Sequence, residues 1–212
     1  MGRAEDRGAV TLPEERRTVD ADRSPPADSS DREMTVHSSG EMRRIVIVGP
    51  GGAGKSVLAR RMGARLGLPV IHLDAHYWSA GWVESPKDVW DRKVRGLIAG
   101  DRWIMDGNYG RTVDVRFAAA DTIVFLDFPR RISIPRVIRR AIVYRGRTRP
   151  DLAEGCPEQV PLEFLRYLWR YPRDSRPRIV AAMHGSGAHA RHVVLRAPRE
   201  VARFLASLPE SG

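Results

Sequence analysis

Residues 45–56 read Ile-Val-Ile-Val-Gly-Pro-Gly-Gly-Ala-Gly-Lys-Ser, and this stretch decides the fold. The first four residues are β-branched and apolar, which predicts a buried strand that stops at Gly49. From Gly49 the chain fits the pattern G-x-x-x-x-G-K-[ST], and the residues that follow have helical spacing up to Leu66. A strand, a glycine-rich loop and a helix in this order predict a phosphate-binding loop.

The chemistry of this loop rests on its backbone and on two side chains. Glycines permit conformations in which successive N–H groups point at phosphate oxygens, and the following helix adds its positive dipole. We expect Lys55 to bind the β- and γ-phosphates and the Ser56 hydroxyl to ligate Mg²⁺. The chain has 33 Arg and only 3 Lys, yet it uses lysine here, because a planar guanidinium does not replace a compact ammonium. The expected nucleotide-binding residues are Gly49, Gly51, Gly52, Ala53, Gly54, Lys55, Ser56 and Val57.

Predicted strands and helices alternate along the rest of the chain. Further strands are predicted at 69–73, 103–105, 122–126 and 192–195, and helices at 57–66, 86–98, 132–144, 162–171 and 199–208. Such alternation predicts an α/β fold in which five parallel strands are joined by crossovers, with helices on both faces of the sheet.

Charge divides the chain near residue 41. Residues 1–40 hold 6 Arg, no Lys and 9 Asp or Glu, while the whole chain has a net charge of +10, so residues 41–212 carry +13. The first segment is rich in Asp, Ser and Pro and predicts a disordered leader, which translation from Met34 or Met42 would omit. The basic remainder is expected to form one domain that binds nucleotides, phosphorylated metabolites or nucleic acid, unless the excess of arginine only reflects genome composition.

Composition also excludes several classes of protein. No apolar run approaches 18 residues, which argues against a membrane span, and the charged N-terminus is unlike a secretory signal. The chain has a single cysteine, Cys156, which excludes an internal disulfide framework and a multi-cysteine zinc site. We therefore expect a cytoplasmic protein that is a monomer or a homodimer.

Two acids follow predicted strands, where ligands of α/β proteins bind. Asp106 is suited to hold Mg²⁺ or its water, although an Asp-Gly pair also caps turns. Asp74 is suited to orient an acceptor hydroxyl or accept its proton. His72, Asp74 and His76 alternate, so a strand would place them on one face, where a zinc site is conceivable, although His72 fits a packed strand position better. Trp78 would wall a substrate pocket or pack in the core.

Residues 130–149 contain eight arginines and no acid. Arg136 and Arg140 share a helix face and would repel each other unless an anion lay between them. Arg147 and Arg149 follow in a loop, and the four together predict a lid, at about residues 130–158, that closes over phosphates and stabilises the transferring group. A solvated basic face and a nucleic-acid contact are the alternatives.

Beyond the phosphate loop, five motifs carry a resemblance to a known family. They are HLD at 72–74, WIMDGNYG at 103–110, FLDFPR at 125–130, YRGRTRPD at 144–151 and EGCPE at 154–158. Residues 43–207 resemble the bacterial DNA topology modulation proteins, which are related to the adenylate-kinase-like nucleoside and nucleotide kinases. The resemblance implies a five-stranded parallel sheet with the phosphate-loop strand central, and ATP and Mg²⁺ as ligands. Asp106-Gly107 with Arg111 is similar to adenylate kinases, which implies that Arg111 binds an acceptor phosphate.

Two functions follow from these observations. In the first, the protein is an ATP- and Mg²⁺-dependent phosphotransferase that acts on a small nucleotide-like or hydroxylated acceptor. In the second, it is an ATP-regulated nucleic-acid-binding protein that affects DNA topology through its arginine-rich helix. The residues expected to act in the first are Lys55, Asp74, Asp106, Arg136, Arg140, Arg147 and Arg149 in catalysis, Asp74, Trp78 and Arg111 in acceptor binding, and Ser56 and Asp106 as metal ligands.

Overall fold

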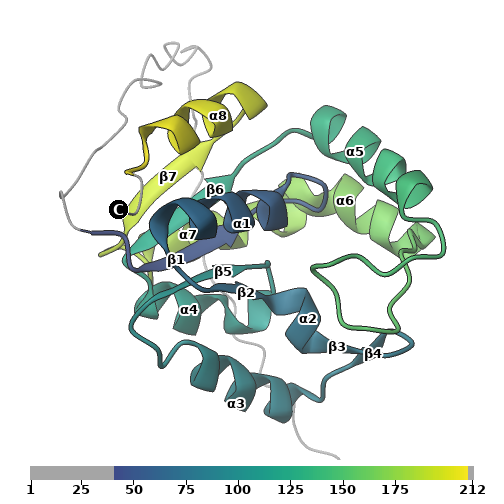
Figure 1. Ribbon diagram of the computed structural model, residues 1–212, viewed down its shortest axis with the longest axis horizontal. Helices are drawn as coiled ribbons and strands as arrows, with labels where there is room; N and C mark the ends of the chain where they lie inside the picture. The colour runs from purple at the N-terminus through teal and green to yellow at the C-terminus, as the bar shows by residue number, and fades with distance from the viewer. Residues whose placement is uncertain (1–40, 210–212) are drawn as a thin grey trace, which may run out of the picture. The chain divides into compact units, whose positions relative to one another are not determined.

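The computed structural model describes residues 41–209, so the predicted leader lies outside the described residues. The elements in chain order are β1 Arg44–Val48, α1 Lys55–Leu66, β2 Val70–His72, α2 Leu73–Tyr77, β3 Trp78–Ser79, β4 Val83–Glu84, α3 Lys87–Leu97, β5 Trp103–Asp106, a 3-10 turn Gly110–Thr112, α4 Val113–Ala119, β6 Thr122–Leu126, α5 Arg130–Val143, α6 Leu162–Asp174, α7 Arg176–His184, β7 Arg191–Leu195 and α8 Pro198–Ser207. Five strands form one parallel sheet in the order β2-β5-β1-β6-β7 (Figure 1). The predicted α/β fold with a central phosphate-loop strand is confirmed.

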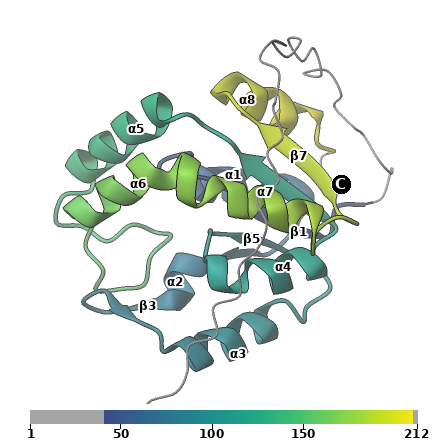
Figure 2. The same ribbon diagram turned by 180° about the vertical axis from the view of Figure 1, so that it is seen from behind.

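Strand β1 is buried on both faces because helices cover both sides of the sheet. Val46 and Val48 lie in one apolar cluster with side chains of α3, α4 and α7, while Ile45 and Ile47 lie in a second cluster with α1 and α8. Figure 2 shows α6 and α7 on the side of the sheet opposite α1. A strand buried on both faces has to be apolar at every position, which explains the unbroken run Ile45–Val48.

The order of the strands places the phosphate loop at a switch in the direction of the connections. From β1 the chain crosses to β2 on one side of β1, whereas β6 and β7 lie on the other side. Ligands of open α/β sheets bind outside the carboxyl ends of the strands at such a point. The loop at 49–54 follows β1 there, and Asp106 ends the neighbouring strand β5.

Local structure differs from the sequence prediction at three places. The strand predicted at 69–73 ends at His72, and Leu73–Tyr77 form a short helix, so His72, Asp74 and His76 do not alternate along one strand face. A two-stranded hairpin, β3 with β4, follows that helix. Helices α4 and α7 were not predicted, because α4 has 7 residues and α7 begins only two residues after α6 ends.

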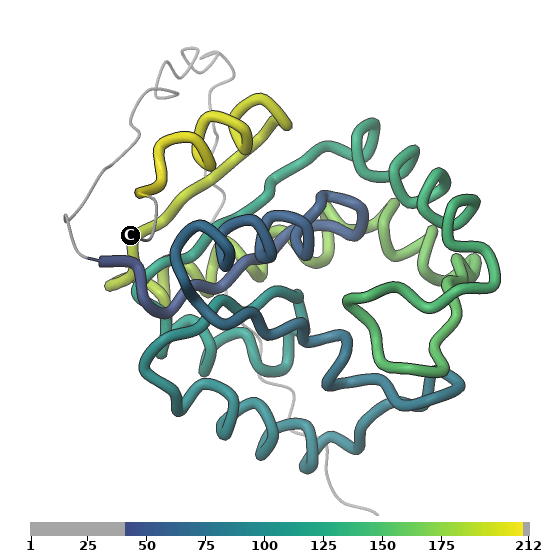
Figure 3. Tube along the Cα trace, in the orientation of Figure 1, coloured from purple at the N-terminus to yellow at the C-terminus, as the bar shows by residue number. Residues whose placement is uncertain are grey.

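The segment at 144–161 connects α5 to α6 and lies beside the β3–β4 hairpin (Figure 3). It contains most of the arginine-rich loop that the sequence predicts as part of a lid. Within residues 41–209, no helix combines the length and apolar character that crossing a bilayer requires.

Candidate functional site

The phosphate loop adopts the conformation that its glycines were expected to permit. Gly52 and Gly54 have φ angles of +80° and +96°, which side chains rarely tolerate. A Cβ on Gly52 would also lie 2.5 Å from the carbonyl oxygen of Ser133 on α5, so the loop packs closely under that helix. Gly54 is the N-cap of α1 and carries no capping side chain, which leaves the first N–H groups of the helix for an anion.

Lys55 is held inside the curve of the loop. Its Nζ donates hydrogen bonds to the carbonyl oxygens of Gly49 at 3.0 Å and Pro50 at 3.2 Å. Burial lowers the pKa of Lys55, although the charges of Asp74 and Asp106 partly oppose this shift. The ammonium therefore lies within electrostatic reach of Asp74 and Asp106, where an anionic ligand would compensate its desolvation.

Ser56, Asp106 and His72 form a hydrogen-bonded chain across three elements. The Ser56 hydroxyl donates to Asp106 Oδ2 at 2.8 Å, and His72 Nδ1 lies 2.5 Å from Asp106 Oδ1. His72 and Asp106 are register partners at the ends of β2 and β5. Burial alone would lower the pKa of His72, but the hydrogen bond to Asp106 and the negative charges of Asp106 and Asp151 together raise this pKa above its usual value. The structure thus brings together Ser56 and Asp106, the two predicted metal ligands, and adds His72, which the sequence analysis considered as a packed strand residue or as part of a zinc site with Asp74 and His76.

The loop after β5 is fixed from both sides. Asn108 Oδ1 accepts a hydrogen bond from the backbone N–H of Gly49 at 3.0 Å, and its Nδ2 donates to the hydroxyl of Tyr167 on α6 at 2.9 Å. Arg116 of α4 is fully buried and donates to the carbonyl oxygens of Gly107, Asn108, Tyr109 and Thr112. Burial lowers the pKa of Arg116 to about 10, so it stays charged at neutral pH. Nothing in the sequence indicated this role, because an arginine on a short helix is normally solvated.

Asp74, the predicted acceptor-binding acid, lies close to an aromatic cluster. It lies in the first turn of α2, and its Oδ1 accepts a hydrogen bond of 2.6 Å from the hydroxyl of Tyr109. The ring of Tyr109 packs against Tyr77 and Trp90, with centroids 4.7 and 4.9 Å apart. Trp78 is partly buried in β3, where its ring contacts those of Tyr77 and Trp82. Asp74 is therefore held by an aromatic cluster that the sequence reveals only in part.

The predicted catalytic arginines divide into two groups. Arg136 donates to the carbonyl oxygen of Ala53 at 3.4 Å, and its guanidinium lies 5.6 Å from the ring centre of Phe128. Arg140 and Arg149 both contact Glu158, at 2.9 and 3.0 Å. The carboxylate of Glu158 is almost fully buried, with 1% of the side chain exposed.

Glu158 supplies a negative charge to Arg140 and Arg149 from outside the arginine-rich segment at 130–149, whereas an anion between Arg136 and Arg140 stays a prediction. Arg149 also pairs with the buried Asp151 at 3.5 Å. Both arginines contribute to the lowered pKa of Lys55, which places their charge near the phosphate loop.

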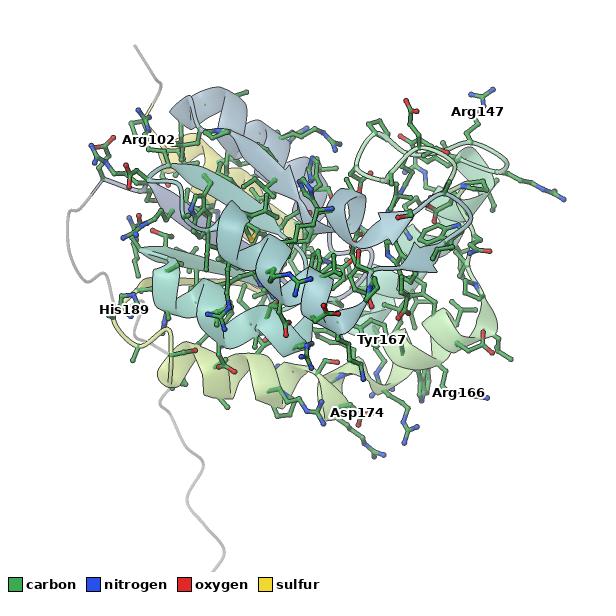
Figure 4. All side chains as sticks on the ribbon, turned by 90° about the horizontal axis from the view of Figure 1, so that it is seen from below. Arg102, Arg147, Arg166, Tyr167, Asp174 and His189 are labelled. Carbon is green, nitrogen blue, oxygen red and sulfur yellow. The ribbon has the colours of Figure 1, made fainter. Side chains whose placement is uncertain are left out.

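Two predicted site residues lie apart from these groups. Arg147 is exposed, and its side chain extends away from the rest of the site (Figure 4). Arg111 forms a bidentate ion pair with Asp91 of α3, with Nη2 2.6 Å from Oδ2. The acceptor role of Arg111 stays a prediction, and it would require this arginine to leave or share its partner.

A pocket of about 370 Å³ opens beside the phosphate loop. Its walls are mainly apolar and come from the loop, α1, the end of β6 and α8, with two arginines at the rim. The lining residues are Gly52, Ala53, Gly54, Val57, Leu58, Arg61, Leu126, Phe128, Arg136, Pro198, Val201, Ala202 and Leu205. The contributions of β6 and α8 were missed, because nothing local in the sequence connects residues 126–128 and 198–205 with the loop.

Comparisons with known proteins support the fold that this site belongs to. No family model matches the chain. A shikimate kinase of Paramagnetospirillum magneticum is 32% identical over 134 residues, and the match covers 56% of this chain and 65% of that relative, which is less than two thirds of its length.

Solved structures of similar fold cover more of the chain. A shikimate kinase from Acinetobacter baumannii in complex with shikimate has a TM-score of 0.51 at 16% identity, over 78% of this chain and 89% of the other. A gluconokinase from Sinorhizobium meliloti has a TM-score of 0.46 at 16% identity, over 78% and 93%. The fold is that of the P-loop kinases, a five-stranded parallel sheet flanked by helices.

Proposed function

We propose that this protein transfers the γ-phosphoryl group of ATP to a hydroxyl group of a small molecule. The observation that carries the proposal is the convergence of Lys55, Ser56 and Asp106 at the mouth of a glycine-rich loop, with Ser56 Oγ 2.8 Å from Asp106. An ammonium, a hydroxyl and a strand-end carboxylate in this arrangement are the groups that P-loop enzymes direct at a nucleoside triphosphate and its metal ion. The similarity to a shikimate kinase adds support for kinase activity.

The donor would bind across the loop and the adjoining pocket. Its phosphates would accept hydrogen bonds from the N–H groups of the loop and of the first turn of α1, and charge from Lys55. Its base would enter the pocket between α8 and the loop, where Phe128 and Pro198 offer apolar surface and Arg136 a planar cation. The size of the pocket, about 370 Å³, lies in the range of small-ligand sites.

Ser56 and Asp106 are the residues that would hold Mg²⁺. A hydroxyl and a carboxylate oxygen suit this ion, which binds through one or two protein oxygens and otherwise through phosphates and water. The residues present therefore fit a magnesium site that is shared with the nucleotide. Within residues 41–209, no group of three or more His, Cys, Asp or Glu is arranged to hold a metal ion without such a ligand. When bound, the ion would neutralise the charge that develops on the phosphate oxygens.

On the acceptor side, Asp74 would orient the reacting hydroxyl and accept its proton. The acceptor oxygen would then form a bond to the γ-phosphorus while the bond from this phosphorus to the oxygen bridging to the β-phosphate breaks, and ADP leaves. Arg140 and Arg149 would stabilise the negative charge on the transferring group. Arg140 donates to Glu158 through its Nε atom, which leaves its two Nη atoms for the transferring group. Catalytic roles for Arg136 and Arg147 stay predictions. Acceptor binding by Arg111 and Trp78 also stays a prediction.

A screen for acceptor-stimulated ADP release tests this proposal. Shikimate, other hydroxylated metabolites, nucleosides and nucleotides are each added to the full chain with MgATP. We expect one class of acceptor to raise ADP release well above the rate with water, and Asp74→Asn to lower that rate by about 10² to 10⁴ while MgATP binding is retained. Failure of every acceptor, with MgATP bound, would contradict the proposal.

The second function, nucleic-acid binding with an effect on DNA topology, has weaker support. Arg140 and Arg149 are mostly buried, with 24% and 9% of their side chains exposed, so they do not form an open basic surface against which a duplex could lie. Duplex DNA binding in the micromolar range at physiological salt, weakening steeply with added salt, would favour it. The resemblance to the DNA topology modulation proteins, the cytoplasmic location and the monomeric or homodimeric state stay predictions.

A further inference from the structure

The lid segment contacts the acceptor-side hairpin at a position that the proposed reaction does not use. The backbone N–H of Gly81 donates to the carbonyl oxygen of Gly155 at 2.9 Å, and Trp82 Nε1 donates to the carbonyl oxygen of Pro157 at 3.0 Å. Between them, the Cys156 thiol is fully buried and donates to the carbonyl oxygen of Ser79 at 3.2 Å. Three hydrogen bonds thus join residues 79–82 to residues 155–157.

Both sides of this contact have unusual backbone geometry. Trp82 has a φ of +61°, a left-handed conformation that is unfavourable for a bulky residue unless its surroundings hold it there. Gly155 has a φ of +76°, and a Cβ at this position would lie 2.7 Å from the Cβ of Ala80. The hairpin and the lid segment therefore approach as closely as a glycine allows, and their contact stabilises a strained tryptophan.

The next residue connects this contact to the phosphate side. Glu158 follows Pro157, and its buried carboxylate pairs with Arg140 of α5 and Arg149 of the lid. Its backbone N–H donates to the carbonyl oxygen of Arg147 at 2.9 Å. Four consecutive residues, Gly155–Glu158, thus contact the hairpin after Asp74 at one end and the arginines near Lys55 at the other.

We propose that Gly155–Glu158 form a latch segment that connects the β3–β4 hairpin to Arg140 and Arg149. Through this connection, closure of the acceptor side and closure of the phosphate side occur as one event. The coupling between the two substrates rests on the proposed function, whereas the contact itself does not. Glu158 is a positioning residue here, because it acts through the two arginines and touches no substrate. Ligands that favour the same closed arrangement strengthen each other's binding.

The single cysteine of the chain reports on this contact directly. Because Cys156 is buried between the hairpin and the lid, a thiol reagent such as dithiobis(nitrobenzoate) reacts with it only when the latch segment opens. In the full chain we expect the reaction to be at least about 10-fold slower than in urea-unfolded protein. A rate equal to that of unfolded protein would overturn the proposal.

A matched pair of glycine variants isolates the contact. Gly155→Ala introduces a Cβ against Ala80, whereas Gly146→Ala changes a lid glycine with a similar φ of +71° and no atom within 4 Å of the added Cβ. Both carry the same backbone strain, so only the first disturbs the hairpin contact. We expect the thiol rate to rise about 10-fold more in Gly155→Ala than in Gly146→Ala, and equal rates would contradict the proposal.

A pair of tryptophan variants tests the same contact if Gly155→Ala does not fold. Trp82→Phe removes the hydrogen bond to Pro157 but keeps an aromatic ring, while Trp169→Phe changes an exposed ring on α6 and serves as its control. The thiol rate should rise about 5-fold in Trp82→Phe and stay within about 2-fold in Trp169→Phe. An unchanged rate in Trp82→Phe would count against the latch segment.

A non-hydrolysable ATP analogue with Mg²⁺ tests the coupling. Once calorimetry shows that the analogue binds, it should slow the thiol reaction about 5-fold in the wild type, and Glu158→Gln should remove this effect. Bound analogue without slowing would overturn the coupling while the proposed function stands. If the analogue does not bind, the proposed function and the coupling are both overturned. The glycine and tryptophan variants would still decide whether the contact between the hairpin and the latch segment exists.

Discussion

The donor side and the acceptor side of this site are built in different ways. On the donor side, the loop residues proposed to contact the phosphates are neighbours in sequence, from Gly49 to Ser56, between a strand and a helix. On the acceptor side, the contacts join segments far apart in the chain, such as Tyr109 with Asp74 and Trp82 with Pro157. The proposed donor site thus depends on a local motif, whereas the proposed acceptor site depends on long-range packing, which can change while the fold is kept.

The largest effect is expected on the donor side. Lys55→Ala removes the ammonium that hydrogen-bonds to the carbonyl oxygen of Gly49 and is proposed to bind the phosphates, so acceptor-stimulated turnover should fall by about 10³-fold or more. Steady-state ADP release measures this effect, with circular dichroism as the check that the variant is folded. Near-normal turnover in Lys55→Ala would break the assignment of the loop as the catalytic phosphate site.

A second large effect is expected where the two sides meet. Arg116→Met leaves the carbonyl oxygens of the loop at 107–112 without their buried donor, which should lower the free energy of unfolding by about 4 kcal/mol. Urea denaturation of the full chain measures this. Arg102→Met, at a solvent-exposed arginine (Figure 4), is the control and should change stability by less than about 0.5 kcal/mol. Equal effects in the two variants would refute the structural role of Arg116.

A smaller effect, on the KM for ATP, is expected in the pocket beside the phosphate loop, where the base of the nucleotide is proposed to bind. Ala202→Trp places a large ring at the pocket wall, so the KM for ATP should rise about 10-fold while kcat changes little. Ala206→Trp, one turn further along α8 and outside the pocket, should leave both constants within about 2-fold of wild type. If the two variants behave alike, the base binds elsewhere.

The smallest effect concerns the exposed ion pair of Arg111 and Asp91. Arg111 holds the pKa of the Asp91 carboxyl below its usual value, so the stability from this pair is present at neutral pH and is lost as pH falls through the lowered pKa. Asp91→Asn should therefore lower Tm slightly at pH 7 and not at strongly acidic pH, as a thermal melt at each pH would show. A rise in the acceptor KM in Arg111→Gln, but not in Asp91→Asn, would show that Arg111 leaves this pair for a substrate.

The sequence predicted those parts of the site that depend on local pattern. The loop, Asp106 at the end of β5 and the central position of the first strand follow from a motif, hydrophobic runs and a family resemblance, whereas Asp74, predicted to follow a strand, lies in helix α2. Ser56 and Asp106 were expected to act together, and the structure places them in hydrogen-bond contact. The helical conformation at 73–77 was missed, since short segments after a strand carry little periodicity.

Residues whose roles depend on burial could not be predicted. Arg116 and Glu158 look like surface residues in the sequence, and only the packing of α4 and of the lid shows that both are buried with specific partners. The pairing of Arg140 and Arg149 with Glu158 depends on how the chain folds back after residue 150. Long-range pairing of this kind leaves no signal in sequence spacing.

Titration calorimetry of the full chain with MgATP tests the central claim, that the loop at 49–56 binds the triphosphate of a nucleotide, most directly. We expect saturable heat with one site per chain in the wild type, and a loss of at least about 10-fold in affinity in Lys55→Ala. No heat with either ATP or GTP, or equal affinity in the wild type and Lys55→Ala, would contradict the account.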